Sequence, residues 1–208
     1  MKRYLPLVLL ALFAFVAAQA GATNLIQNGN FQSNDFTDWT IGTTSNGTWG
    51  SGFPSVTSWP LGGMNAAEGQ VGEVNFDGTQ QGGTLTQTFQ SAGGAATESL
   101  LWLAQGSGNA DGGEFTMILN GVQIAQFDTG SINGQLTGSL SASAPLLAGT
   151  NTLEIDVTRR FISTSGTPFQ FVTGVDVEGN GVPEPGSLVL MGSGVLGLAG
   201  VLRRKLNF

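Results

Sequence analysis

Short apolar runs recur along the middle of the chain, and none of them keeps the 3.6-residue period of a helix. In Thr152–Val157 every second residue is aliphatic and the residues between are Glu154 and Asp156, which predicts a strand with one buried face. Ser99–Ala104 is apolar on both faces, which predicts a central strand covered on each side. The other runs that predict strands are Leu25–Ile26, Glu73–Phe76, Thr84–Phe89, Phe115–Leu119, Val122–Phe127, Leu136–Ala142 and Phe169–Val177.

Turn residues separate these runs, and one pair predicts a specific hairpin. Asn120-Gly121 joins two apolar runs, and both residue types tolerate the positive φ that a two-residue hairpin needs. Eight or nine short strands spread over residues 23–181 predict an all-β fold, a single β-sandwich of the jelly-roll type.

Residues 1–22 predict a cleaved signal peptide. Lys2 and Arg3 supply a positive start, and the apolar run Leu5–Ala18 has the length of a signal-peptide core rather than of a membrane span. Ala20 and Ala22 each end a small-x-small pattern, so we expect cleavage after one of them, preferably the second.

Residues 182–208 predict a second targeting segment. Its uncharged part, 186–202, would be about 25 Å long as a helix and predicts a transmembrane helix. A basic cluster follows it and places this end in the cytoplasm, with the β-sandwich outside: Arg203, Arg204 and Lys205.

Composition excludes several kinds of chemistry. The chain has no Cys and no His, which removes Ser-His-Asp and Cys-His catalysis, the usual zinc sites and disulfides. Between residues 23 and 182 the cations are Arg159 and Arg160, against 13 acidic residues, a balance of −11. Nucleic acid is therefore excluded as a partner, because phosphate neutralisation needs clustered Lys and Arg. Because a buried acid would find few cations to pair with, most acids are expected at the surface. The two arginines are adjacent in an extended run, so they are expected on opposite faces of a strand.

Aromatic side chains are candidate contacts for sugars. Trp39 and Trp102 lie in or beside apolar runs and are predicted to be core residues. Trp49 and Trp59 lie in stretches rich in Gly, Ser, Thr and Pro, so we name them candidate carbohydrate-binding residues. The alternative for this pair is a small core made by packed loops.

No catalytic residue and no metal ligand is predicted. Carboxylates offer the remaining route to catalysis, but glycoside hydrolysis needs two of them about 5–9.5 Å apart. The sequence does not pair the candidates in space: Glu68, Glu73, Asp111 and Glu114. The stretch Gly106–Gly113 lacks the spacing of a calcium loop and is predicted to be a plain loop.

The C-terminal residues VPEPGSLVLMGSGVLGLAGVLRRK resemble a PEP-CTERM sorting tail. The resemblance rests on the order of three features: a Pro-Glu-Pro motif, a Gly- and Leu-rich span and a short basic cluster. It implies recognition by an exosortase, a membrane transpeptidase of Gram-negative bacteria that make extracellular polysaccharide. That enzyme would cut at or near the motif, Pro183, Glu184 and Pro185, and the protein would sit in the inner membrane before processing.

Two short segments resemble galactose-binding-like jelly rolls: the opening, Asn24–Gln32 with Phe36–Trp39, and the closing strand, Phe171–Val177. The resemblance implies carbohydrate binding and a structural calcium where the first and last strands meet. The sequence departs from that pattern, because Gln32 and Thr173-Gly174 replace the usual acidic residues. Calcium prefers several anionic oxygens, so no cofactor is expected here and calcium is the alternative.

These observations together predict an exported, non-enzymatic protein of the cell envelope or extracellular matrix that is sorted by an exosortase. Its expected task is to bind, or to be embedded in, the extracellular polysaccharide of a biofilm. Two alternatives stay open: a purely structural surface protein that binds no sugar, and a glycoside hydrolase that uses carboxylates.

Overall fold

The computed structural model describes residues 23–162 and 168–179, together with five isolated positions near the C-terminus, 192, 194, 195, 197 and 198. Ala22–Asn180 forms one compact unit. The predicted signal peptide, residues 1–22, and most of the predicted transmembrane helix, 186–202, lie outside the described residues. Among the residues that are described, no helix is long and apolar enough to cross a membrane.

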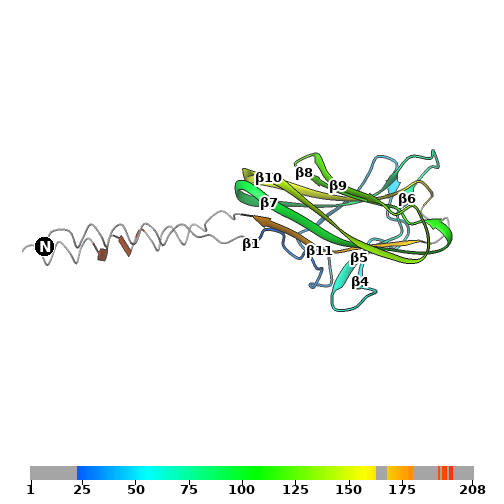
Figure 1. Cartoon of the computed structure of the whole chain (residues 1–208), viewed down its shortest axis with the longest axis horizontal. Coiled ribbons are helices and arrows are strands. Elements are labelled where there is room, and N and C mark those ends of the chain that lie inside the picture. Colours follow the sequence, from blue (N-terminus) through cyan, green and yellow to red (C-terminus); the bar gives the residue numbers. More distant parts are fainter. Residues whose placement is uncertain (1–22, 163–167, 180–191, 193, 196, 199–208) are drawn as a thin grey trace, which may run out of the picture. The chain divides into compact units, whose positions relative to one another are not determined.

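The compact unit is built from strands (Figure 1). Two of them are very long, β7 (Gln81–Asp111) and β10 (Ser131–Arg159), and β11 (Phe169–Gly179) is the third longest. The shorter strands are β1 (Thr23–Asn24), β2 (Thr40–Thr43), β3 (Gly47–Thr48), β4 (Ser55–Ser58), β5 (Asn65–Gly69), β6 (Gly72–Glu73), β8 (Glu114–Leu119) and β9 (Val122–Asp128).

β7 and β10 pair along their whole length as one antiparallel ribbon, which is folded over near its middle. The fold lies where Gly93, Gly94 and Gly149 have positive φ values of 83°, 104° and 99°. Glycine adopts this conformation without a steric penalty, so both strands can bend sharply at the same place. Each strand therefore contributes one half to each of two layers.

The strand pairings define the two layers of a β-sandwich. The first contains β2, the early half of β7, the late half of β10, β8 and β9. The second contains β4, β5, β11, the late half of β7 and the early half of β10. The main core lies between them and joins side chains from both halves of the ribbon, such as Leu85 and Trp102. The predicted all-β sandwich is thus confirmed.

Most strand predictions are confirmed, but their boundaries are not. Asn120 and Gly121 have φ values of 51° and 79° and close the β8–β9 hairpin as predicted. Separate predicted strands merge into β7 and β10, because the glycines between them bend the chain without interrupting the ladder. The prediction of a plain loop at Gly106–Gly113 is wrong, since β7 continues to Asp111.

The expectation that the acids lie at the surface fails at two positions. Glu73 and Glu98 are fully buried. Backbone N–H groups stabilise each of them: Asp77 and Gly78 donate to Glu73 Oε2, and Ala144 donates to Glu98 Oε2 at 3.1 Å. Burial raises the pKa of Glu98 above its ordinary value. Backbone N–H groups thus take the place of the cations that the domain lacks.

The two arginines lie on opposite faces, as predicted, with Arg159 buried and Arg160 exposed. The Arg159 guanidinium donates to the carbonyl oxygens of Val71 at 3.1 Å and Ile162 at 2.8 Å. Burial lowers the pKa of Arg159, and nearby Asp111 opposes this shift.

Candidate functional site

The outer face of the second layer carries the candidate site. In the late half of β7 even-numbered residues such as Trp102 and Ala104 face the main core, so Leu103 and Gln105 face the opposite side. On this outer face the register places Gln135 of β10, Gln105 of β7 and Phe169 of β11 side by side in one row across three strands. Residues up to 64 positions apart in sequence are thereby brought together.

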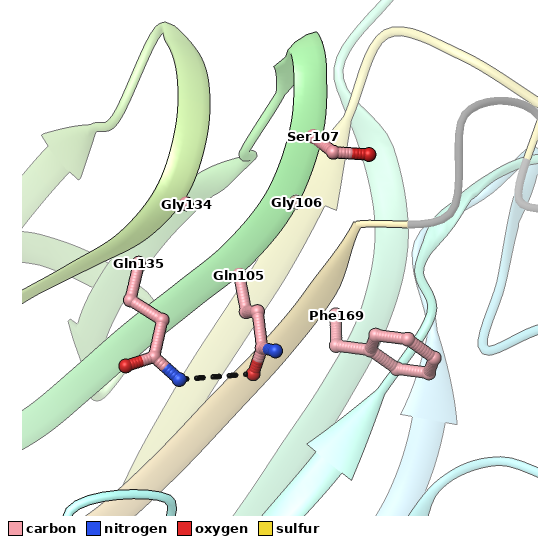
Figure 2. Close-up of a pocket in the computed structure, with 6 residues that line it drawn as sticks. All are labelled: Gln105, Gly106, Ser107, Gly134, Gln135 and Phe169. Atoms are coloured by element: carbon pink, nitrogen blue, oxygen red, sulfur yellow. Dashed lines mark hydrogen bonds between the residues drawn. The ribbon is translucent and has the colours of Figure 1, made fainter.

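This row lines a pocket of about 320 Å³ (Figure 2). The Gln135 amide donates to Gln105 Oε1 at 3.2 Å, and the Phe169 ring lies on the neighbouring strand. Gly106, Ser107 and Gly134 complete the lining. A β-bulge between Ile132 and Gly134 bends β10 at the pocket, where Gly134 has a φ of 109°.

The pocket has no charged residue in its lining. Two amides and one hydroxyl supply both hydrogen-bond donors and acceptors, and Gln105, Gln135 and Ser107 are all exposed to solvent. Phe169 is half-buried and held by Phe53, with the ring centroids 5.9 Å apart. Amides beside an aromatic ring are suited to a neutral polyhydroxyl ligand, while no lining group could neutralise a phosphate.

Trp59 lies on this outer face but does not offer its ring to solvent. It is 5% exposed and packs edge-on against Phe171, with centroids 6.5 Å apart, in a small cluster that also contains Leu103. The turn after β4 carries it, closed by hydrogen bonds from Trp59 N to Met64 O and from Gly62 N to Trp59 O. Its prediction as an exposed sugar contact is wrong, and the alternative of a core made by a packed loop is confirmed.

Trp49 is also buried, with 6% of its surface exposed. Its indole N–H donates to Gly42 O at 2.8 Å, and its ring lies flat where side chains at Gly69 and Gly83 would otherwise be. The ring therefore fills space that two glycines leave open, and its prediction as an exposed sugar contact is wrong too. Trp39 and Trp102 are core residues, as predicted.

The residues that line the pocket were not predicted from the sequence. Gln105, Gln135 and Phe169 carry no local motif, and their common feature is the alternation of side chains on three paired strands. Only the register shows that they meet. The available signal was the polar residue Gln105 directly after the apolar run Ser99–Ala104.

The carboxylates considered for catalysis lie on four different strands. Glu68 is on β5, and burial raises its pKa, partly offset by a hydrogen bond from the Ser55 hydroxyl. Glu73 is buried in β6, Asp111 ends β7 and Glu114 begins β8. Neither this pocket nor the second one described below has two carboxylates in its lining.

Another carboxylate group lies on the outer face of the first layer. Asp156 and Glu154 are neighbours on that face of β10, and Glu114 of β8 lies diagonally across from Asp156. Among the described residues, Asp156 Oδ1 is buried without a hydrogen-bond partner. Burial and the two neighbouring negative charges raise the pKa of Asp156 to about 6.

A second pocket, of about 290 Å³, lies where β1 and β11 meet and is the place at which the resemblance implied calcium. Asp176 is its one carboxylate, and Oδ1 of this residue has no hydrogen-bond partner among the described residues. The amide oxygens of Asn24, Asn28 and Asn30 already accept backbone N–H groups. Calcium needs six to eight oxygens, several of them anionic, so this donor set does not fit it.

Departures from the family pattern explain this poor fit. Gln32 is exposed, and the Thr173 hydroxyl donates to Asn65 O. Throughout the described part of the chain, no group of three or more acidic residues is arranged to hold a metal ion.

The β-sandwich is similar to several solved structures at low sequence identity. TmCBM61, solved in complex with β-1,4-galactotriose, is 11% identical with a TM-score of 0.47, over 75% of this chain and 98% of that one. The carbohydrate-binding module CBM36, solved with calcium and xylotriose, is 15% identical with a TM-score of 0.36, over 67% and 97%. The K3 cleaved adhesin domain of Lys-gingipain from Porphyromonas gingivalis is 13% identical with a TM-score of 0.45, over 76% and 99%. At these TM-scores the similarity carries no functional argument.

No curated protein matches the sequence. One family profile does match, and it covers residues 181–205. This range contains the Pro-Glu-Pro motif, the Gly- and Leu-rich span and the basic cluster on which the resemblance was based. The chain therefore carries a PEP-CTERM protein-sorting motif at its C-terminal end.

Proposed function

We propose that this protein is exported, sorted by an exosortase and binds neutral extracellular polysaccharide on the outer face of its second layer. The observation that carries the proposal is the uncharged row of Gln135, Gln105 and Phe169 in one pocket. The PEP-CTERM motif supports the cellular setting. The protein acts as a binding module without catalysis, and the absence of two carboxylates from the lining of either pocket supports this part.

The ligand chemistry follows from the groups in the pocket. A glutamine amide offers a donor and an acceptor in one plane, as two adjacent sugar hydroxyls require. The C–H face of a pyranose can lie against Phe169, while Ser107 contributes one more hydroxyl. A strongly anionic polymer would be repelled by the domain, which carries 13 acids against two arginines between residues 23 and 182.

The test is binding of the purified full chain to a panel of neutral and acidic polysaccharides, measured by affinity electrophoresis and titration calorimetry. Gln105→Ala with Gln135→Ala is expected to weaken binding by about tenfold or more, because each lost hydrogen bond contributes about 1 kcal/mol. Runs with calcium and with chelator should give the same affinity, since the donor set at the second pocket does not fit the ion.

The chain offers a matched control on β9, the edge strand of the other layer. Gln123 and Gln126 are also exposed, and they share a side-chain hydrogen bond of 2.6 Å. Replacing both by alanine should leave binding unchanged. Equal loss of binding in the two double variants would overturn the assignment of the pocket. If the protein binds none of the sugars saturably, the purely structural role is favoured.

Sorting by an exosortase has its own test. Glu184→Ala is expected to abolish processing, because the substitution removes the charged centre of the Pro-Glu-Pro motif. A full-length, membrane-bound form should then accumulate, detected by mass spectrometry of membrane fractions. Ser187→Ala, just beyond the motif, serves as the control and should be processed normally. An unchanged mature mass in Glu184→Ala cells would contradict the proposal.

A further inference from the structure

The outer edges of the two layers differ in how well they are protected. β2 and β4 have four residues each, which leaves little backbone for another strand to pair with. β9 is longer, but its ladder is interrupted by a bulge opposite Met117 and Ile118, and it ends at the charged residue Asp128. Short length, bulges and charges are common ways to protect a sheet edge.

The early half of β10 lacks most of this protection. From Gln135 to Ala144 it pairs with β7 on one side, and none of the described strands pairs with its other side. A bulge before Gly134 and a proline at Pro145 frame the segment, so ten consecutive residues form a regular strand, of which only Ala144 has its N–H bonded to a side chain, Glu98, by a hydrogen bond described above. We call Gln135–Ala144 the open edge.

Apolar side chains are also partly exposed beside the open edge. Leu136 of β10 is 38% exposed. Phe127 of β9 is 42% exposed and stacks on Trp102, which pairs with Gly138 in the middle of the edge. The sandwich is thus incompletely closed along this side, and a covering strand would bury part of both side chains.

Charge identifies the partner that fits the open edge. The uncharged stretch around it runs from Thr129 to Leu153, in a domain whose balance is −11. Two copies of this domain repel each other at most orientations, and the repulsion is weakest when uncharged surfaces meet. The outward side chains of the edge are Gln135, Thr137, Ser139, Ser141 and Ser143, all neutral hydrogen-bonding groups that can face their own kind across a two-fold axis.

We propose that two copies of this protein pair antiparallel through Gln135–Ala144 and continue the second layer from one molecule into the next. The pairing is isologous, because each copy contributes the same segment around a two-fold axis normal to the sheet. Since such an axis keeps the outer faces on the same side, the two pockets come to lie on one continuous surface. The pairing itself does not depend on the proposed sugar binding and can be tested without any sugar.

The absence of cysteine from the chain makes cross-linking a clean test. Single cysteines replace Thr137, Ser139 or Ser141 in the full chain, purified in mild detergent, and one variant carries cysteines at both 139 and 141. Residues opposite each other across an antiparallel pair have Cα separations that a disulfide can span. If the two-fold axis passes through one of the three residues, that residue faces its own copy, and its single-cysteine variant is expected to form a disulfide-linked dimer. If the axis passes through residue 140, residue 139 faces residue 141 of the other copy, and the double variant is expected to form the dimer.

The matched control places single cysteines at Gln123 and Gln126 of β9, which are also exposed. These variants should form disulfide-linked dimers only at the level expected from random collisions. Ser139→Lys should weaken dimer formation by about tenfold, because like charges face each other across the axis, while Gln123→Lys should not. Mass is followed by light scattering against concentration. A monomer at all concentrations without cross-linking above background, or a dimer insensitive to Ser139→Lys, would overturn the proposal.

Discussion

Replacing Trp102 by alanine is expected to lower the free energy of unfolding by about 3–5 kcal/mol. Trp102 is 2% exposed and stacks between two rings, Phe115 at 5.2 Å and Phe127 at 4.6 Å between centroids. It also lies against Gly138, which has no side chain to fill the cavity from that side. A loss of this size is a large part of the stability of a typical domain. Urea unfolding followed by circular dichroism measures it.

Trp102→Phe is the informative companion variant. It keeps an aromatic ring in the stack and removes the indole N–H, which has no hydrogen-bond partner among the described residues. The cost should therefore be clearly smaller than that of alanine, because the phenyl ring keeps part of the stacking and leaves a smaller cavity. Leu147→Ala, at a highly exposed site, should change stability by less than about 0.5 kcal/mol. Equal losses in the two Trp102 variants would contradict the role of stacking.

Asp156→Asn is expected to stabilise the protein by about 1.5 kcal/mol at pH 7.5, after allowance for solvent screening of a partly exposed group. Burial, Glu154 and Glu114 raise the pKa of Asp156 to about 6 in the folded state, above its value in the unfolded chain. The folded state thus binds this proton more tightly than the unfolded chain does. The free energy of unfolding therefore increases as the pH falls from about 6 to 4 and decreases as the pH rises through the same range. Asparagine imitates the protonated form at every pH.

Thermal unfolding at pH 4, 5, 6 and 7.5 separates this effect from others. The difference between Asp156→Asn and the unmodified protein should be greatest at pH 7.5 and should vanish near pH 4. Asp128→Asn is the control, because its oxygen accepts the Gly130 N–H from an exposed site and asparagine can keep that bond. A gain for Asp156→Asn that is equal at all four pH values would show that charge is not the cause.

The alternation of apolar and polar residues was sufficient to predict the fold class and the strands from β7 onward, but not the short strands β1–β5. It works at Leu153 and Ile155 because each is buried against the opposite layer. It could not predict that β7 and β10 continue through their glycines, since Gly93 and Gly149 interrupt the pattern. In the ladder Gly149 is paired with Ser91, two residues from Gly93, so both strands bend at the same place. Local sequence identifies a turn residue, whereas the partner strand determines whether the ladder breaks.

The candidate site was less predictable than the fold. Trp49 and Trp59 lie in stretches that usually form exposed loops, but Gly83 and the Leu103 cluster leave room for their rings. Neither contact is local, and so composition alone suggested exposure. Gln105 and Gln135 meet for the opposite reason, because the β7–β10 register aligns two residues that have no pattern of their own.

The placement of β11 has a mechanical consequence. This strand begins at Phe169, in the pocket, and ends at Gly179, from which the chain continues towards the sorting motif. It is flanked by β5 and β7. If the protein is held at its sorting end and binds a polymer in the pocket, as proposed, a pull on that polymer runs along β11 and loads its backbone hydrogen bonds in shear. Bonds loaded in shear share the force and must break together, so this arrangement resists a pull far better than a hairpin that is peeled open one bond at a time.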